Sequence, residues 1–192
     1  MAKSPTSAVL HLDHVRLSFP VIFKPRAFSA GQEPAFQASF LLDTANAKHA
    51  TKISELKSQA KKLALEAFGN KIPPDLKVCI GNGDNKEYDG YKGMIYVSAR
   101  NQTRPTVVNR ARNPVAEGDT EAPYAGCYVN ATITLWAQNN QYGKRINANL
   151  RAIQFVEDGE AFGRGPVAAD DEFEMLDDAP VGNTEADDFP IG

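Results

Sequence analysis

The chain has 192 residues, of which 42% are hydrophobic, and this composition suits one globular domain with some additional chain. No stretch approaches the roughly 20 apolar residues that span a bilayer, and the first residues lack the apolar run of a secretory signal, so neither a membrane protein nor a secreted one is expected. The formal net charge of −3 hides a basic body, +6 over residues 1–169, and an acidic end, −9 over residues 170–192.

Two cysteines, Cys79 and Cys127, are too few for a disulfide framework. A reduced, cytoplasmic setting therefore fits best. Both thiols are expected to fill space in the core rather than to react.

The first half of the chain contains two predicted strands and one strong helix. Residues 9–19 alternate, with Val15, Leu17 and Phe19 on the side expected to face the core, and residues 35–43 alternate in the same way. Between about 44 and 68, apolar residues recur every three or four positions and form one helical stripe. The lysines on the rest of this helix are typical of a solvated face more than of a DNA contact.

The second half consists of predicted strands joined by turns. The strands are expected at 77–80, 94–100, 106–108, 126–138 and 146–156, with a hairpin turn over 139–145. The Gly-rich stretch 81–93 is not a phosphate-binding P-loop, because no Gly-Lys-Ser/Thr follows and no helix begins there.

These elements predict a mainly β fold, a small closed or partly closed β-barrel with an inserted α-helix. The domain is expected to occupy residues 1–163. Residues 164–192 are acidic, contain Gly and Pro, and have few β-branched residues, which predicts a disordered C-terminal tail.

The side of each strand that faces away from the predicted core carries an unusual mixture of side chains. In 126–138 it carries Tyr128 and Trp136 among Asn, Thr and Gln, and in 94–100 it carries Tyr96, Ser98 and Arg100. In 145–151 it carries Arg145, Asn147, Asn149 and Arg151. Rings stack on unpaired bases, and arginines reach phosphates, so this composite face predicts binding of single-stranded nucleic acid. Cross-strand packing of the aromatic residues in an ordinary sheet remains an open alternative.

The residues predicted to bind DNA share this outward face or the basic loop and turn beside it. They are Tyr96, Arg100, Arg104, Tyr128, Trp136, Lys144, Arg145, Asn147 and Arg151. Arg110 and Arg112 belong to the same basic loop, which contains no acidic residue between 100 and 114, and a solvated loop is an equally open reading of it.

Several motifs resemble a family of tailed-bacteriophage single-stranded-DNA-binding proteins. They are "YAGCYVNATITLWAQNNQYGKRINANLRAIQFVEDGEAFG", "GNGD…YDGYKGMIYVSAR…RPTVVNR", "RLSFPVIFKP" and "FQASFLLD", which together cover about residues 9–163. The resemblance implies a five-stranded OB-fold that coats single-stranded DNA during phage replication or recombination in the cytoplasm of the infected host. It implies neither catalysis nor a cofactor. In "QYGKR" the turn differs from the family pattern, and Tyr142, Lys144 and Arg145 are hypothesised to extend the DNA path there.

The chain ends in "DDFPIG", which is similar to the ends of bacterial single-stranded-DNA-binding proteins, where an acidic run precedes an apolar residue, Pro and another apolar residue. The resemblance implies that Asp187, Asp188, Phe189, Pro190 and Ile191 bind replication or recombination proteins. Folding back onto the basic body, in competition with DNA, is a second role, and a contribution to solubility alone is the simpler alternative.

Four other interpretations are considered. His11 and His14 lack the companions of a zinc site, and Asp84, Glu87 and Asp89 favour turn formation over the Mg²⁺ site of a nuclease. A structural phage protein without a nucleic-acid role is the main rival to DNA binding, and strand annealing would share the binding face. The oligomeric state is open, with a homodimer as one alternative.

Overall fold

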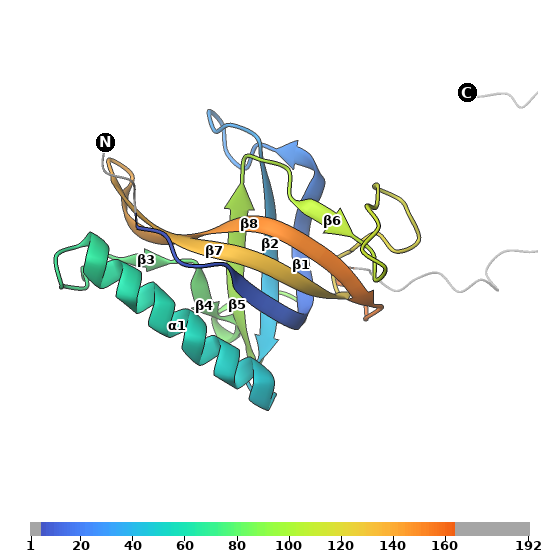
Figure 1. Cartoon of the computed structure of the whole chain (residues 1–192), viewed down its shortest axis with the longest axis horizontal. Coiled ribbons are helices and arrows are strands. Elements are labelled where there is room, and N and C mark those ends of the chain that lie inside the picture. Colours follow the sequence, from blue (N-terminus) through green and yellow to red (C-terminus); the bar gives the residue numbers. More distant parts are fainter. Residues whose placement is uncertain (1–4, 164–192) are drawn as a thin grey trace, which may run out of the picture.

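The computed structural model describes residues 5–163 (Figure 1). The predicted tail, including Asp187 to Ile191, lies outside the described residues. Among the residues described, no helix is both long and apolar enough to cross a membrane.

Five long strands close into a barrel (Figure 1). They are β1 (Leu10–Arg26), β2 (Ala35–Asp43), β5 (Met94–Asn101), β7 (Tyr128–Asn140) and β8 (Gly143–Glu157). Antiparallel pairing links β7, β1, β2 and β5 in that order, and β7 also pairs with β8. Parallel pairing of β8 with β5, at Ala99–Ala148 and Arg100–Asn149, closes the ring. Closure leaves these five strands without a free edge along the barrel wall.

Strand β1 is long enough to serve two neighbours. Its first part pairs with β7 and its second part with β2, and Arg16 is paired on both sides. Register shifts occur between Leu12 and Val15 and between Ser18 and Val21. Each shift contains a residue in the left-handed region, His14 at φ 52° and Phe19 at φ 46°. These bulges bend the strand around the barrel.

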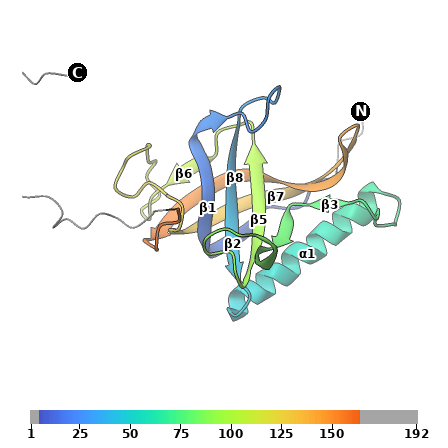
Figure 2. The same ribbon diagram turned by 180° about the vertical axis from the view of Figure 1, so that it is seen from behind.

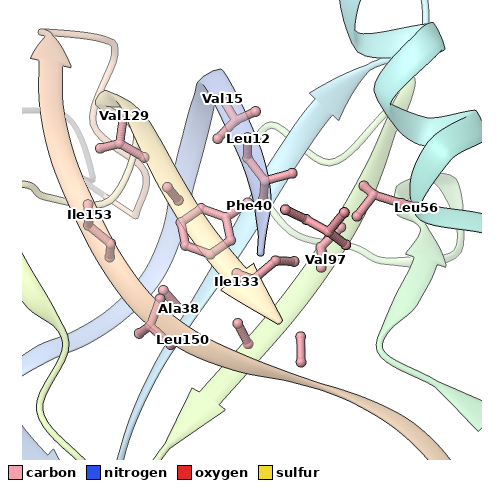
Figure 3. Close-up of a cluster of buried hydrophobic side chains, with 14 of the residues drawn as sticks. Leu12, Val15, Ala38, Phe40, Leu56, Val97, Val129, Ile133, Leu150 and Ile153 are labelled. Carbon is pink, nitrogen blue, oxygen red and sulfur yellow. The ribbon is translucent and has the colours of Figure 1, made fainter. Parts of the chain in front are cut away.

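The core fills the barrel with alternate residues of all five strands. Phe40 of β2, Ile133 of β7 and Leu150 of β8 are fully buried and point toward one another (Figure 3). Helix α1 (Ala47–Ala67) lies across one end, and Leu56 points from it into the same cluster (Figure 3). The helix therefore closes an opening that the strands leave.

The position of α1 is fixed by its first turn. The side chain of Asn46 caps the helix by accepting hydrogen bonds from the backbone N–H groups of Lys48 and His49. The buried His49 ring accepts from Asp43 N–H through Nδ1 at 2.9 Å, so its Nε2 donates to the Asp13 carbonyl at 3.3 Å. One side chain thus joins the helix to β1 and to the end of β2.

Short elements complete the fold. They are β3 (Lys77–Val78), β4 (Ile80–Asn82), the 3₁₀ turn η1 (Gly83–Asn85) and β6 (Thr106–Val108). β3 and β6 pair with β8, and β4 pairs with β5.

The predicted mainly β barrel with one inserted helix is confirmed, and the helix and strands lie close to the expected ranges. Two expectations were wrong in detail. β1 continues through Pro20 and Pro25 to Arg26, and Phe19, which was expected to face the core with Leu17, is 48% exposed because the bulge reverses the alternation.

Replacing Leu56 by Ala should lower the free energy of unfolding by about 2–5 kcal/mol, because it leaves a cavity where the helix meets the barrel. Chemical denaturation measures the change. The neighbouring Lys57→Ala, at an exposed position, should change it by less than about 0.5 kcal/mol, and an equally small effect of Leu56→Ala would contradict the role of α1 as a plug.

Candidate nucleic-acid interface

An open groove of about 620 Å³ crosses the outer surface of β1, β2 and β5. The loop between β4 and β5 forms one wall and passes in front of β2 in Figure 2. Its lining combines rings, cations and small polar groups. The residues that characterise it are Phe19, Phe28, Tyr88, Tyr91, Tyr96, Arg26, Lys86, Ser39 and Ser98, and we call it the aromatic groove.

The rings in the groove contact one another in a chain. Phe19 meets Tyr88 edge to face at 4.9 Å between ring centroids, Tyr88 meets Tyr91 at 5.3 Å, and Tyr91 meets Tyr96 at 5.8 Å. Phe19 and Tyr88 are 48% and 52% exposed, whereas Tyr91 is 3% exposed. A buried ring thus supports two rings that stand in solvent.

Tyr91 is fixed to the sheet below it. Its hydroxyl interacts with the side chains of Ser18 and Ser39, and burial raises the pKa of this phenol, against the opposing effect of those two hydrogen bonds. Ser39 and Ser98 hydroxyls are 3.0 Å apart across β2 and β5. Small serines on the outer side of these strands therefore leave room for the Tyr91 side chain to be buried against the barrel.

Three cations border the groove. The Lys86 ammonium lies 5.8 Å from the centroid of the Tyr96 ring, and the Arg100 guanidinium lies 5.0 Å from that of Phe28. Arg100 also donates to the Gln32 side chain and to the Glu33 carbonyl, both at 3.3 Å. Arg26 is exposed at the end of β1. Positive charge therefore accompanies the rings along the groove.

Phe19 holds an uncommon conformation for a bulky residue. A left-handed φ of 46° on a phenylalanine costs on the order of 1–3 kcal/mol, and such strain concentrates at functional sites. The bulge that causes it brings the ring out of the barrel and into contact with Tyr88.

Of the residues predicted from sequence, the structure places Tyr96 and Arg100 at this groove. β5, β8 and β7 are neighbours in that order, so the outward residues of these three strands belong to one sheet. Arg100 pairs with Asn149, and Asn149 pairs with Thr134.

Trp136, Arg145 and Asn147 lie farther along β7 and β8, where Trp136 pairs with Asn147. Trp136 is half-buried beside Thr6, and the Asn147 amide donates to the side chain of Gln138 at 3.0 Å. The Lys144 ammonium is 5.9 Å from the ring centroid of Phe68. We call this second region the β7–β8 strip.

Arg104 and Arg151 are both exposed. They lie near each other in the sheet, since Thr106, just after Arg104, pairs with Ala152, just after Arg151. Arg110 and Arg112 belong to the turn that follows β6, and Arg110 lies 5.8 Å from the ring centroid of Phe155. Among the described residues, none of these four arginines forms a salt bridge. Their charge is therefore available to a ligand.

Tyr128 lies apart from both regions. Its ring stacks on His14 at 4.6 Å and has the Arg16 guanidinium 5.6 Å from its centroid. His14 in turn contacts the Glu157 carboxylate at 2.6 Å. Protein side chains already occupy the surroundings of this ring.

Four rings of the groove were not among the predicted site residues. Phe19 was assigned to the core, and Phe28, Tyr88 and Tyr91 lie in connections without periodicity. The only available signal was the density of aromatic residues in the Gly-rich stretch 81–93, where Tyr88 and Tyr91 stand beside Lys86.

The rival sites receive structural roles. Asp84 accepts a hydrogen bond from Gly93 N–H at 2.8 Å, and Asp89 accepts one from Gly163 N–H at 3.2 Å. Within residues 5–163, no group of three or more His, Cys, Asp or Glu side chains is arranged to hold a metal ion. Burial raises the pKa of Cys79 to about 12 and that of Cys127 to about 11, in keeping with space-filling thiols.

A family model described as the ssDNA-binding protein of Enterobacter phage Enc34 matches residues 8–189. The chain belongs to this family. Putative protein p50 of Acyrthosiphon pisum secondary endosymbiont phage 1 is 38% identical over 176 residues, which cover 87% of this chain and 93% of that protein.

Two solved structures are also similar. The bacteriophage Enc34 single-stranded-DNA-binding protein in complex with ssDNA is 31% identical, with a TM-score of 0.71 over 81% of this chain and 89% of that one. Bacteriophage T7 gp2.5, at 15% identity and a TM-score of 0.52, covers 94% of this chain and 99% of its own and shows the fold alone. The Enc34 family consists of DNA-binding proteins, so the prediction that this chain is not an enzyme is confirmed.

The motifs that carry the family resemblance form a clasp between two chain segments. The Tyr124 hydroxyl donates to the Asp158 carboxylate at 2.9 Å and accepts from Gly159 N–H at 3.1 Å. Gly126, at φ 105°, lies so close to the Glu160 carbonyl that a Cβ there would collide with it. The Tyr-x-Gly-Cys-Tyr block and the Asp-Gly-Glu segment are thus two halves of one packing arrangement.

Gly126→Ala should reduce the free energy of unfolding by about 2 kcal/mol or more, because it combines a left-handed backbone with a collision at the Glu160 carbonyl. Gly118→Ala is the matched control, since Gly118 has φ 91° but open space around its Cβ position, and it should cost about 1 kcal/mol. Equal effects in denaturant unfolding would show that the clasp is not tightly packed.

Proposed function

We propose that this chain binds single-stranded DNA without strong sequence preference and that the aromatic groove is the centre of its interface. The observation that carries the proposal is the pair of exposed rings, Phe19 and Tyr88, standing on a buried Tyr91 beside Lys86. Membership of the Enc34 family supports it, as does the similarity to a protein solved in complex with ssDNA.

The chemistry of the groove suits unpaired bases. Each base offers a flat face, and stacking on an aromatic side chain contributes about 1–3 kcal/mol per base. A duplex keeps its base faces covered, so exposed rings favour a single strand. Besides its cations and tyrosines, the groove is lined by the hydroxyls of Ser39 and Ser98 and the Gln37 amide, and these few uncharged groups fit weak sequence preference.

The cations supply the second part of the binding energy. Arg26, Lys86 and Arg100 border the rings, and phosphates that they neutralise release counterions, so affinity falls as salt rises. Beyond Arg100, the sheet continues through Asn149 to the β7–β8 strip, and Arg104 and Arg151 lie near the end of β5. We infer that a longer strand leaves the groove over one of these two surfaces.

The acidic end of the chain is proposed to have two roles. The last described residue, Gly163, donates its N–H to Asp89 in the loop that lines the groove, and we infer that the −9 charge of residues 170–192 acts on the cations from this attachment point. Competition with DNA for the groove is one role. Recruitment of phage or host replication and recombination proteins through Asp187 to Ile191, inside the infected cell, is the other.

Tyr88→Ala should weaken binding of a fluorescein-labelled oligo-dT by about 1–3 kcal/mol, or about 5- to 150-fold in Kd, because it removes one stacking face. Fluorescence anisotropy at two salt concentrations measures the change. Ile72→Ala, which truncates an apolar side chain about as exposed as Tyr88 but outside the groove and the β7–β8 strip, is the control and should bind as the unmodified chain does.

The same titration with Trp136→Ala, together with quenching of the lone tryptophan, locates the interface. Normal binding by Tyr88→Ala with weakened binding by Trp136→Ala would move the centre of the interface to the β7–β8 strip. An unmodified chain that binds no oligonucleotide at low salt would favour a structural phage protein instead.

Deletion of residues 170–192 should tighten binding to oligo-dT severalfold at low salt, because it removes nine negative charges from the neighbourhood of the groove. The gain should shrink as salt rises. Weaker binding by the truncated chain would rule out competition between this segment and DNA.

A further inference from the structure

The loop that carries Tyr88 is anchored at its base. Gly83 is buried against the Tyr91 carbonyl with no room for a Cβ, and the Asp84 carboxylate bonds to Gly93 N–H. The tip, residues 86–90, reaches out from this base. Its position against the barrel therefore depends on what lies at its sides.

One side of the tip rests on β1 and the other on the end of the described chain. Tyr88 meets the ring of Phe19 at 4.9 Å. At Gly90 a Cβ would collide with the ring of Phe162, so that ring lies directly on the backbone of the tip. Gly163 N–H then donates to the Asp89 carboxylate at 3.2 Å.

Phe162 is itself held by Arg16. The guanidinium lies 4.3 Å from the centroid of the Phe162 ring and donates to the carbonyls of Gly126, at 3.2 Å, and Glu160, at 2.7 Å. Phe162 N–H donates to the Ala125 carbonyl at 3.0 Å. Arg16 stands three residues before Phe19 on β1, so one strand supports both sides of the loop tip.

We propose that Phe162 and Arg16 are positioning residues of the DNA interface. They hold the tip of the β4–β5 loop so that Tyr88 stands against Phe19 before DNA arrives. The proposal rests on the groove being the DNA site. The clasp contains no catalytic group. In this proposal it contributes to DNA binding through the neighbouring Phe162.

The physical reason is the entropy of the loop. Gly90 and Gly93 both have positive φ values, which glycine adopts at little cost, so a released tip would have many conformations open to it. Binding would then have to order Tyr88 as well as the DNA, and the affinity would fall accordingly. The supporting residues lower that cost without contacting the ligand.

A double-mutant cycle between Phe162→Ala and Tyr88→Ala, measured as oligo-dT affinity, tests the proposal. Phe162→Ala should weaken binding by about two- to tenfold. If Phe162 acts through Tyr88, the double variant should bind no more weakly than Tyr88→Ala alone, within about a factor of two. Affinities that multiply independently, or a Phe162→Ala chain that binds normally, would overturn the positioning role.

Arg16→Gln distinguishes support from phosphate contact. A positioning residue should lower affinity at every salt concentration while leaving the slope of log K against log salt unchanged, whereas a lost phosphate contact reduces that slope by about one. A reduced slope would therefore overturn the role assigned to Arg16.

Controls separate the outcomes. Ile72→Ala truncates an exposed apolar side chain outside the groove and the β7–β8 strip and should leave affinity unchanged. Thermal unfolding checks each variant, and Phe162→Leu replaces Phe162→Ala in the cycle if the latter does not fold. If Tyr88→Ala weakens DNA binding and Phe162→Ala does not, the positioning role is refuted while the proposed function stands. Absence of binding by the unmodified chain refutes the proposed function.

Discussion

The shape of β1 is the constraint on which the barrel and its interface both depend. The strand must leave β7, turn, and join β2, and it does so through bulges at His14 and Phe19, each with a left-handed backbone. Such conformations cost on the order of 1–3 kcal/mol per residue, which burial of the core around Val15 and Leu17 offsets. The second bulge also reverses the side-chain alternation. One distortion therefore helps to close the barrel and places an exposed ring on its outer surface.

This coupling explains which features could be predicted from the sequence. β5 pairs without a register shift, and β7 pairs without one from Ile133 to Asn140, so the outward positions of Tyr96, Arg100 and Trp136 follow from period-two counting. The helix follows equally well from its apolar stripe. Phe19 could not be placed, because the bulge before Val21 has no glycine to mark it and the alternation of Val15 and Leu17 predicts the opposite face.

The groove residues that lie in loops could not be predicted for a different reason. Phe28, Tyr88 and Tyr91 lie in connections, where side-chain direction depends on contacts between distant segments rather than on local period. Tyr91 is buried where its hydroxyl meets Ser18 and Ser39, and those serines come from two other strands. Composition could show that aromatic residues gather near Lys86, but only the folded barrel brings them beside Phe19 and Tyr96.

The family motifs could be recognised in the sequence, but their structural role could not be predicted from it. Gly126 and Gly159 belong to motifs that resemble the family. The structure shows that both lie where two backbones meet too closely for a Cβ. The sequence alone could not predict this close approach. The clasp they permit carries the chain from the end of β8 to the rim of the groove, where Gly163 bonds to Asp89. In the proposed function, residues 170–192 compete with DNA from this attachment point, and a covalently attached competitor acts at a raised effective concentration. A short oligonucleotide neutralises few cations and must compete with that concentration. A long strand can also reach the arginines beside β6, so it gains contacts that a short one lacks. In the proposed function, the attachment point of the acidic end therefore favours long single strands over short fragments.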